Sequence, residues 1–224
     1  AALLVEQLRG PLRSAEFRKR IEERYANTRR PDAERPMVKV DGSKDGDRTV
    51  TYDKGGWVFW MLTDLMGRER ALAGLQEFVT TFKDGPDFPV LQDLIAVMRR
   101  HAADPDAFDA FVDQWFHQVA VPEFRFTELE KTRVGDGDVW EVRANIRNDG
   151  TGTVPLEIAA GRGDRMNDDG TENSDYRDAR VSVTIGPGQE LPVTIRCDFE
   201  PDRVLPDPDA RVLQLERARA LRRL

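Results

Sequence analysis

The spacing of apolar residues divides the chain into a helical first part and a second part built from strands. As far as Pro122, apolar residues recur every three or four positions, which is the spacing of one face of a helix. From Trp140 onward they recur at every second position, which is the spacing of a strand with one buried face. The pattern therefore predicts two structural units, with a boundary near residues 120–128.

The first part contains five segments with helical spacing. Residues 57–66 are apolar nearly all round, which is typical of a helix buried inside a domain, and Gly67 ends this segment. Asp104 and Pro105 supply a cap followed by a proline at the first helical position, so a helix is expected to begin there. The other helices are predicted at residues 14–25, 70–82 and 89–98.

The second part contains four short alternating segments separated by turn sequences. Asn-Asp-Gly at 148–150 and Gly-Pro-Gly at 186–188 are typical of turns between antiparallel strands. The strands themselves are predicted at residues 140–146, 154–158, 181–185 and 191–197. Residues 161–179, rich in Asp, Asn and Gly, are expected to form a long exposed loop. Such short strands indicate a small β-sandwich of immunoglobulin-like type.

The predicted fold is therefore a multidomain α and β architecture. We assign residues 1–122 to a helical domain, residues 123–200 to a β-sandwich domain, and residues 201–224 to a tail or a short helix. A chain of 224 residues is long enough to bury a sizeable core in this arrangement.

The composition is that of a soluble and rather polar globular protein, with 39% hydrophobic and 33% charged residues. No apolar run approaches the roughly 20 residues that cross a bilayer, so no membrane span is expected. A net charge of −7 argues against a general nucleic-acid binder, because phosphate backbones require a basic face. Cys197 is the single cysteine; we interpret it as a small core residue, and it leaves the localisation open.

The chain lacks the residues of a complete metal site. A zinc site needs three or four converging ligands, often as H-E-x-x-H on one helix, and the sequence has only His101 and His117. Aligning Gly170 with the glycine of an EF-hand loop puts Arg165 and Tyr176 where acidic ligands are required, so that motif fails as well. We therefore expect no metal ligand and no cofactor-binding residue in this chain.

The stretch TVTYDKGG at residues 49–56 has a composition that a buried helix does not need. Tyr52 and Lys54 stand beside the Gly55-Gly56 pair, directly before the apolar helix. Glycine costs about 1 kcal/mol of helix propensity relative to alanine, and it is tolerated most easily where a backbone or a ligand comes close. Tyr52 is therefore the candidate functional residue. The alternative interpretation is that it caps a core helix.

The Tyr-x-Lys-Gly motif opens a longer ordered series of residues. An apolar helix follows it, then a later helix that ends in tryptophan, a proline and the predicted sandwich; the series is Tyr52, Asp53, Lys54, Gly55, Gly56, Trp57 to Leu62, Gly67, Leu75, Phe78, Phe111, Trp115 and Pro122. This series resembles the gluzincin zinc aminopeptidases, the relatives of aminopeptidase N and leukotriene hydrolase. The likeness covers most of residues 10–215 and is closest to bacterial members in which the peptidase domain follows a transporter-like membrane region.

The resemblance implies a catalytic role for Tyr52. In that family the tyrosine of the motif donates a hydrogen bond to the oxyanion that forms when zinc-bound water attacks a peptide carbonyl. A phenol suits this role because it donates a hydrogen bond without carrying a charge at pH 7. The resemblance also implies that the helical part of the chain is the C-terminal half of a thermolysin-like catalytic domain. Within it, Gly55 and Gly56 are expected to let the start of the buried helix pack against the neighbouring wall. The resemblance leaves Lys54 without a role.

The chain departs from the family pattern at the metal. H-E-x-x-H, the third zinc ligand and the segment that holds the peptide N-terminus are missing from it. The resemblance therefore implies the C-terminal portion of a longer bacterial, membrane-associated parent protein, to which the zinc belongs. The chain alone is expected to be inactive, and a peptide substrate is expected to bind only together with the missing N-terminal half. The alternatives are a non-catalytic peptidase-like scaffold and a protein-binding module whose β-sandwich presents a surface to a partner.

Overall fold

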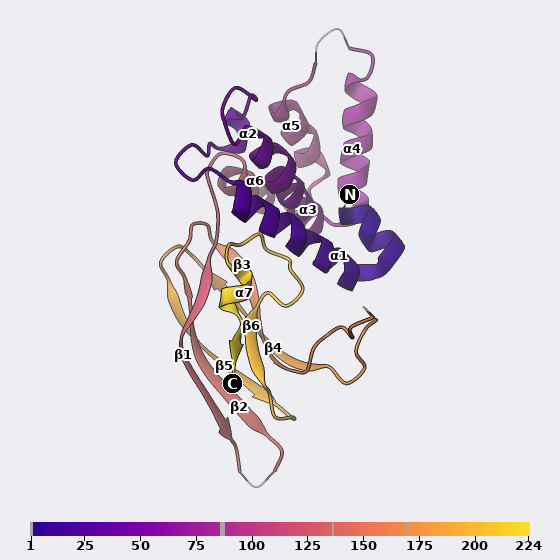
Figure 1. Ribbon diagram of the computed structural model, residues 1–224. Helices are drawn as coiled ribbons and strands as arrows, with labels where there is room; N and C mark the ends of the chain where they lie inside the picture. Colours follow the sequence, from indigo (N-terminus) through magenta and orange to yellow (C-terminus); the bar gives the residue numbers. More distant parts are fainter. Residues whose placement is uncertain (1, 86–87, 136, 170) are drawn as a thin grey trace. The chain divides into compact units, whose positions relative to one another are not determined.

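The computed structural model describes residues 2–85, 88–135, 137–169 and 171–224 (Figure 1). Contacts between backbone positions divide the chain into two compact units, Ala1–Ala120 and Val121–Leu224. The first unit is helical and the second consists mainly of strands, so the chain is a mixed α and β protein with antiparallel sheets. In the part of the chain that the structure describes, no helix is both long and apolar enough to cross a membrane.

The helical unit is built from α-helices and two short turns of other helix types. The α-helices are α1 (Ala2–Thr28), α2 (Asp47–Thr49), α3 (Gly55–Met66), α4 (Arg68–Phe82), α5 (Leu91–His101) and α6 (Pro105–Trp115). A 3₁₀ turn, η1 (Met37–Lys39), and a π-helical turn, η2 (Val50–Lys54), precede α3. The turn η2 runs directly into α3, so Tyr52 belongs to a continuous helical segment.

Helix α1 begins well before the predicted residue 14 and is interrupted at Gly10. Gly10 adopts a φ of 83° and a ψ of 171°, a backbone conformation that L side chains rarely adopt. Pro11 follows, and a proline has no N–H to donate and fits the first turn of a new helical segment. The apolar spacing predicts only the segment after this interruption.

Helix α3 lies in the centre of the helical core, as its apolar sequence predicts. Trp57, Val58 and Leu62 are each at most 2% exposed. The indole N–H of Trp57 donates a hydrogen bond of 2.9 Å to the carbonyl oxygen of Arg18 in α1. The Arg18 guanidinium lies 3.6 Å from the ring centroid of Trp60, a cation–π contact that helps to hold a nearly buried arginine in the core.

The remaining helices pack closely around this centre. A Cβ added to Gly74 of α4 would lie 2.8 Å from the sulfur of Met98 in α5, so the glycine permits a close approach of the two helices. Asp104 caps α6 as predicted, because its Oδ1 accepts hydrogen bonds from the backbone N–H groups of Asp106 and Ala107.

Within the described residues, the β unit contains a three-stranded sheet and a four-stranded sheet, both antiparallel. The first has the order β1-β2-β5, with β1 (Phe124–Arg133), β2 (Trp140–Asn148) and β5 (Glu190–Cys197). The second has the order β4-β3-β6-β7, with β3 (Val154–Arg162), β4 (Arg177–Ile185), β6 (Arg203–Pro206) and β7 (Arg222–Arg223).

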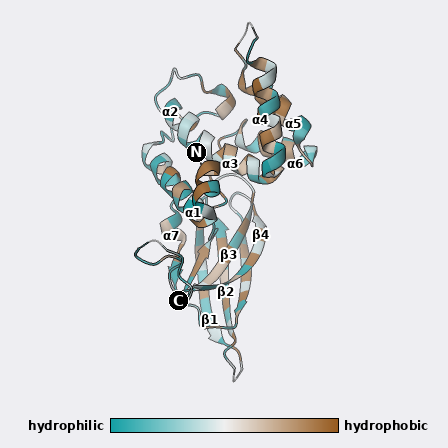
Figure 2. Ribbon diagram, turned by 90° about the vertical axis from the view of Figure 1, so that its right-hand side faces the viewer, coloured by the Kyte–Doolittle hydropathy of each residue, from teal (hydrophilic) through white to brown (hydrophobic). Residues whose placement is uncertain are grey.

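Apolar side chains from both sheets form one core. Figure 2 shows hydrophilic and hydrophobic residues alternating along the strands, as expected for strands with one buried face. Among these apolar side chains, Val142, Ile146, Leu156, Ile158 and Ile185 are each at most 1% exposed.

Strand β1 is an element that the alternation does not predict. Its register with β2 shifts between Phe126 and Glu128, and such a bulge moves the following side chains out of the simple period of two. The residues after the bulge are mostly polar, because β1 has a sheet neighbour on one side only.

Residues 201–224 are not a tail but a part of the β unit. Strand β6 pairs with β3, with Ile158 opposite Pro206 and Gly161 opposite Arg203. This pairing contradicts the expectation of a separate tail. Val204, Ala210, Leu213 and Ala220 are completely buried, so the segment contributes to the core. The short helix expected here exists as α7 (Arg217–Ala220), and the Arg217 guanidinium donates a hydrogen bond of 3.0 Å to the Asp207 carboxylate.

The acidic segment expected to be a loop is shorter than predicted. Strand β3 runs to Arg162 and β4 begins at Arg177, so the connection covers residues 163–176 and contains a bridge between Met166 and Glu172. Gly170, on which the EF-hand alignment rests, lies outside the described residues.

The close packing of backbone around Gly150, in the first predicted turn of the β unit, can be tested by substitution. A Cβ at this position would lie 2.2 Å from the Val121 carbonyl oxygen and 2.6 Å from the Glu123 nitrogen, both backbone atoms that cannot rotate away. We expect Gly150→Ala to lower the free energy of unfolding of the β unit by about 1–3 kcal/mol. Gly137→Ala is the control, because nothing lies within 4 Å of a Cβ there. Hydrogen exchange of the β2 and β3 amides across a urea titration reports unfolding of the β unit, and equal midpoints for the two variants would contradict the described packing.

Candidate functional site

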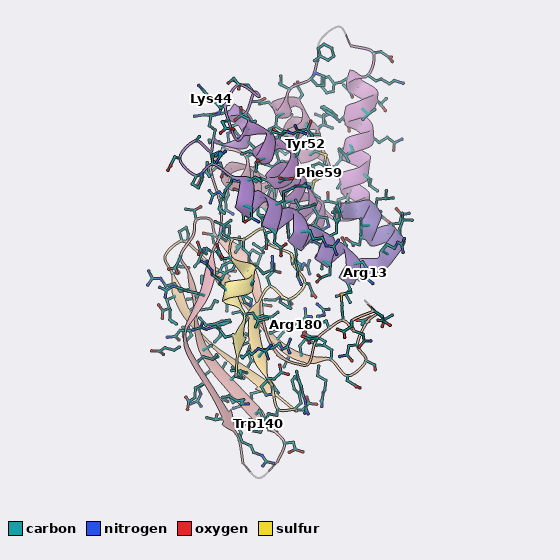
Figure 3. The ribbon with its side chains drawn as sticks, viewed as in Figure 1. Arg13, Lys44, Tyr52, Phe59, Trp140 and Arg180 are labelled. Atoms are coloured by element: carbon teal, nitrogen blue, oxygen red, sulfur yellow. The ribbon has the colours of Figure 1, made fainter. Side chains whose placement is uncertain are left out.

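Tyr52 lies in the π-helical turn η2 and points away from the helical core. Its side chain is 70% exposed, and no residue in the described ranges forms a hydrogen bond with its hydroxyl. The Arg48 guanidinium lies 5.9 Å from its ring centroid. Figure 3 labels Tyr52 and Phe59, which lie seven positions apart on the continuous segment of η2 and α3. The hydroxyl of Tyr52 is therefore available to a molecule outside this chain.

The two glycines of the motif have different environments. The N–H of Gly55 donates to the carbonyl oxygen of Val50, the bond that closes the π-helical turn. A Cβ on Gly55 would lie 3.3 Å from that oxygen of the same turn and 3.6 Å from Cε of Met37. At Gly56, a Cβ would have nothing within 4 Å among the described residues, so Gly56 lies at an open part of the surface.

The two residues after Tyr52 are buried although both carry a charge. Asp53 is 6% exposed, and its Oδ1 accepts a hydrogen bond of 2.8 Å from Nε of Arg24 in α1. Lys54 is 1% exposed, and its Nζ donates a hydrogen bond of 2.7 Å to Oε1 of Glu34. The sequence left Lys54 without a role, and the structure identifies it as one partner of a buried ion pair.

Glu34 is the acceptor at the centre of a buried polar cluster. Besides Lys54, the hydroxyl of Tyr25 donates to its Oε1 at 2.7 Å and Nε of Arg29 donates to its Oε2 at 3.0 Å. The Glu34 side chain is only 1% exposed, and Tyr25 is completely buried. A buried carboxylate requires such partners, because an unpaired charge in an apolar environment is strongly unfavourable.

The pKa shifts in this cluster follow from burial and from the ion pair. Burial alone would raise the pKa of Glu34, but attraction to Lys54 and the hydrogen bonds from Lys54 and Tyr25 outweigh it and hold the pKa below its ordinary value. Burial lowers the pKa of the Lys54 ammonium, and the Glu34 carboxylate opposes that shift. Burial and the neighbouring Glu34 charge raise the pKa of the Tyr25 phenol.

The structure brings no metal site together from the residues it describes. In those ranges, no three side chains of His, Cys, Asp or Glu are arranged to hold a metal ion. His101 lies in α5 with its Nε2 at 2.6 Å from Glu77 Oε2, and His117 is exposed after α6. The zinc that the family resemblance implies therefore does not fit these residues.

Cys197 is the buried core residue that the sequence predicts. It is 2% exposed, and burial together with the nearby Asp198 charge raises the pKa of its thiol to about 11. A thiol with that pKa is protonated at neutral pH, so it is a poor nucleophile.

A surface groove of about 380 Å³ lies in the β unit, away from every residue singled out in the sequence. It follows the bulged part of β1 and the last residues of the chain, and it is lined by Phe126, Thr127, Glu128, Leu129, Leu221, Arg222 and Arg223. In its lining, the Thr127 hydroxyl donates a hydrogen bond of 2.6 Å to the Glu190 carboxylate of β5.

Comparisons with known proteins show no family for this chain. No family model matches the sequence, and no curated protein matches it. One of the solved structures that match is described as a crystal structure of Legionella pneumophila aminopeptidase A in complex with aspartic acid. It has 15% sequence identity and a TM-score of 0.43, and the match covers 92% of this chain and 23% of that chain. The present chain thus spans less than a quarter of the length of that structure.

The buried ion pair can be tested through stability. Lys54→Met removes one of the two cations that bind the buried Glu34 carboxylate and leaves Arg29 as the other. We expect the free energy of unfolding of the helical unit to fall by about 1.5–3 kcal/mol, the range for a lost hydrogen bond to a charged group. Thermal unfolding followed by the helical circular dichroism signal measures this. Tyr52→Phe, at an exposed ring, is the control and should stay within about 0.5 kcal/mol of the unmodified chain; a similarly small loss for Lys54→Met would contradict the assignment.

The same cluster predicts an acid dependence. Because the pKa of Glu34 is lower in the folded state than its ordinary value of 4.5, its ionised form stabilises the fold above pH 4.5. That contribution is lost as the pH falls through the folded-state pKa. The difference in free energy of unfolding between the unmodified chain and Glu34→Gln should therefore be largest above pH 4.5 and shrink in acid. Urea titrations at several pH values measure it, and a difference that does not change with pH would refute this account.

Proposed function

We propose that this chain is the C-terminal portion of a zinc-dependent aminopeptidase of the gluzincin type and that Tyr52 is its oxyanion-stabilising residue. The observation that supports the proposal is the exposure of Tyr52. It is 70% exposed, whereas the next two residues are at most 6% exposed, and no described residue occupies its hydroxyl. A core-capping tyrosine would bury its ring instead.

The chemistry assigned to Tyr52 is the donation of one hydrogen bond. When a peptide carbonyl becomes tetrahedral, its oxygen gains negative charge, and a fixed donor near that oxygen lowers the energy of the transition state. The phenol is neutral, so it favours the charged transition state over the neutral substrate. The zinc ligands of this proposal lie in residues outside the sequence, and for that reason the 224 residues alone are inactive.

The finer fold assignment is part of the same proposal. The helical unit corresponds to the C-terminal half of a thermolysin-like catalytic domain, and the β unit corresponds to an immunoglobulin-like sandwich. The strand orders β1-β2-β5 and β4-β3-β6-β7 support the second assignment, because consecutive strands are exchanged between two sheets as in Greek-key sandwiches. The parent protein is a bacterial member of the family with a transporter-like membrane region.

The alternatives from the sequence are a non-catalytic scaffold and a protein-binding module. The sequence that the native gene encodes upstream of these residues distinguishes the enzyme from both alternatives. An H-E-x-x-H motif upstream supports the enzyme. Its absence supports the scaffold, and a partner protein that still binds after Tyr52→Phe supports the binding module.

The decisive experiment uses the protein extended upstream through its native gene. We expect it to hydrolyse an aminoacyl chromogenic substrate, while the 224-residue chain alone does not. Tyr52→Phe should lower kcat by about 10²–10³, with a smaller effect on KM, because the lost donor acts in the transition state. Tyr176→Phe removes a hydroxyl in the β unit, which bonds to Asp178, and is the matched control. Chelator-sensitive turnover by the 224-residue chain alone, or an unchanged kcat in Tyr52→Phe, would overturn the proposal.

A further inference from the structure

Tyr52, Asp53 and Lys54 are consecutive residues with opposite environments. Their exposed fractions are 70%, 6% and 1%. Successive side chains around a helix point about 100° apart, so the side chain two positions after Tyr52 points to nearly the opposite side. Fixing Lys54 on the buried side therefore directs Tyr52 toward the exposed side.

The Lys54 side chain is fixed by a carboxylate that is itself held in place. Oε1 of Glu34 accepts from both Lys54 and Tyr25, and its Oε2 accepts from Arg29. Tyr25 belongs to the last turns of α1, and Glu34 and Arg29 lie just after its end. Because Glu34 has donors on both oxygens, Nζ of Lys54 has one well-defined position.

Asp53 supplies a second attachment to the same helix. Its carboxylate binds Arg24, the residue directly before Tyr25. Two adjacent side chains of opposite charge thus join the π-helical turn to two adjacent residues of α1, one directly and one through Glu34. This arrangement restricts rotation of the turn about its axis more than a single contact would.

A contribution to stability does not by itself explain why these charged side chains are buried together. Buried ion pairs contribute little net stability, and well-packed apolar residues of similar volume often stabilise a core as well or better. A hydrogen-bond donor that acts on a transition state, by contrast, must be held to about 0.5 Å. π-Helical turns such as η2 are also frequent at functional sites.

We propose that Lys54 and Asp53 are positioning residues that set the direction of the Tyr52 hydroxyl through Glu34 and Arg24. This inference rests on the proposed function for its catalytic meaning. The cluster contacts no substrate, and it acts only by limiting the orientations that Tyr52 adopts.

The test uses two variants that remove one attachment each. Glu34→Gln keeps the shape of the side chain and removes the charge that holds Lys54. Arg24→Ala removes the partner of Asp53; the Arg24 side chain is 61% exposed, so this variant is expected to keep its fold. Asp109→Asn is the matched control, since it removes a carboxylate that binds Arg99 at the surface of the same unit.

The readout is spectroscopic and does not need activity. The chain contains three tyrosines, so fluorotyrosine labelling gives three fluorine signals, and Tyr→Phe variants assign the Tyr52 signal. We expect that signal to shift and broaden in Glu34→Gln and in Arg24→Ala but not in Asp109→Asn. Amide exchange at residues 50–56 should become several-fold faster in the same two variants. If Glu34→Gln does not fold, the fluorine signal and the amide exchange of Arg24→Ala alone test the positioning role.

The upstream-extended protein then gives the catalytic consequence. Arg24→Ala should lower kcat by up to about 10²-fold with KM nearly unchanged, because a small displacement of a catalytic group is costly. An unchanged Tyr52 signal and unchanged exchange in both variants would overturn the positioning role. An unaltered kcat in Tyr52→Phe would overturn the proposed function instead, and the fluorine signal would still decide the positioning role.

Discussion

The buried carboxylate of Glu34 is the constraint on which the geometry of the helical unit depends. It lies in the loop between α1 and η1, and it accepts hydrogen bonds from Tyr25, Arg29 and Lys54. These three donors come from the end of α1, from the loop after it and from the π-helical turn, so one side chain ties three parts of the chain together. Removing any one of these donors leaves the buried carboxylate with fewer partners, which is unfavourable.

This constraint connects the core to the exposed face of η2 and α3. Trp57 and Leu62 of α3 are packed inside the unit, whereas Tyr52 and Gly56 remain open. The segment of η2 and α3 therefore has residues held in the core and residues exposed at the surface. The proposed chemistry needs both, because a hydrogen-bond donor is useful in catalysis only when its support does not move.

The sequence predicts the elements whose pattern is local and misses those that depend on distant partners. Helix α3 and strand β2 follow from periodicity alone, but β1 loses its alternation at the bulge after Phe126, and β6 is recognisable only beside β3. At the candidate site, the motif makes Tyr52 the candidate, and its catalytic role stays a prediction; the structure shows that its side chain is exposed. The role of Lys54 could not be predicted, because its partner Glu34 lies twenty positions earlier in a segment without periodicity.

The pairing of β6 with β3 has a consequence for how the β unit is made. During synthesis, the edge of β3 that receives residues 203–206 stays unpaired until those residues have left the ribosome. A contact between residues so far apart in sequence also closes slowly, because a long loop must be ordered first. The nascent unit therefore carries an open strand edge until β6 pairs with β3, and this edge is where a chaperone or a second nascent chain would bind first.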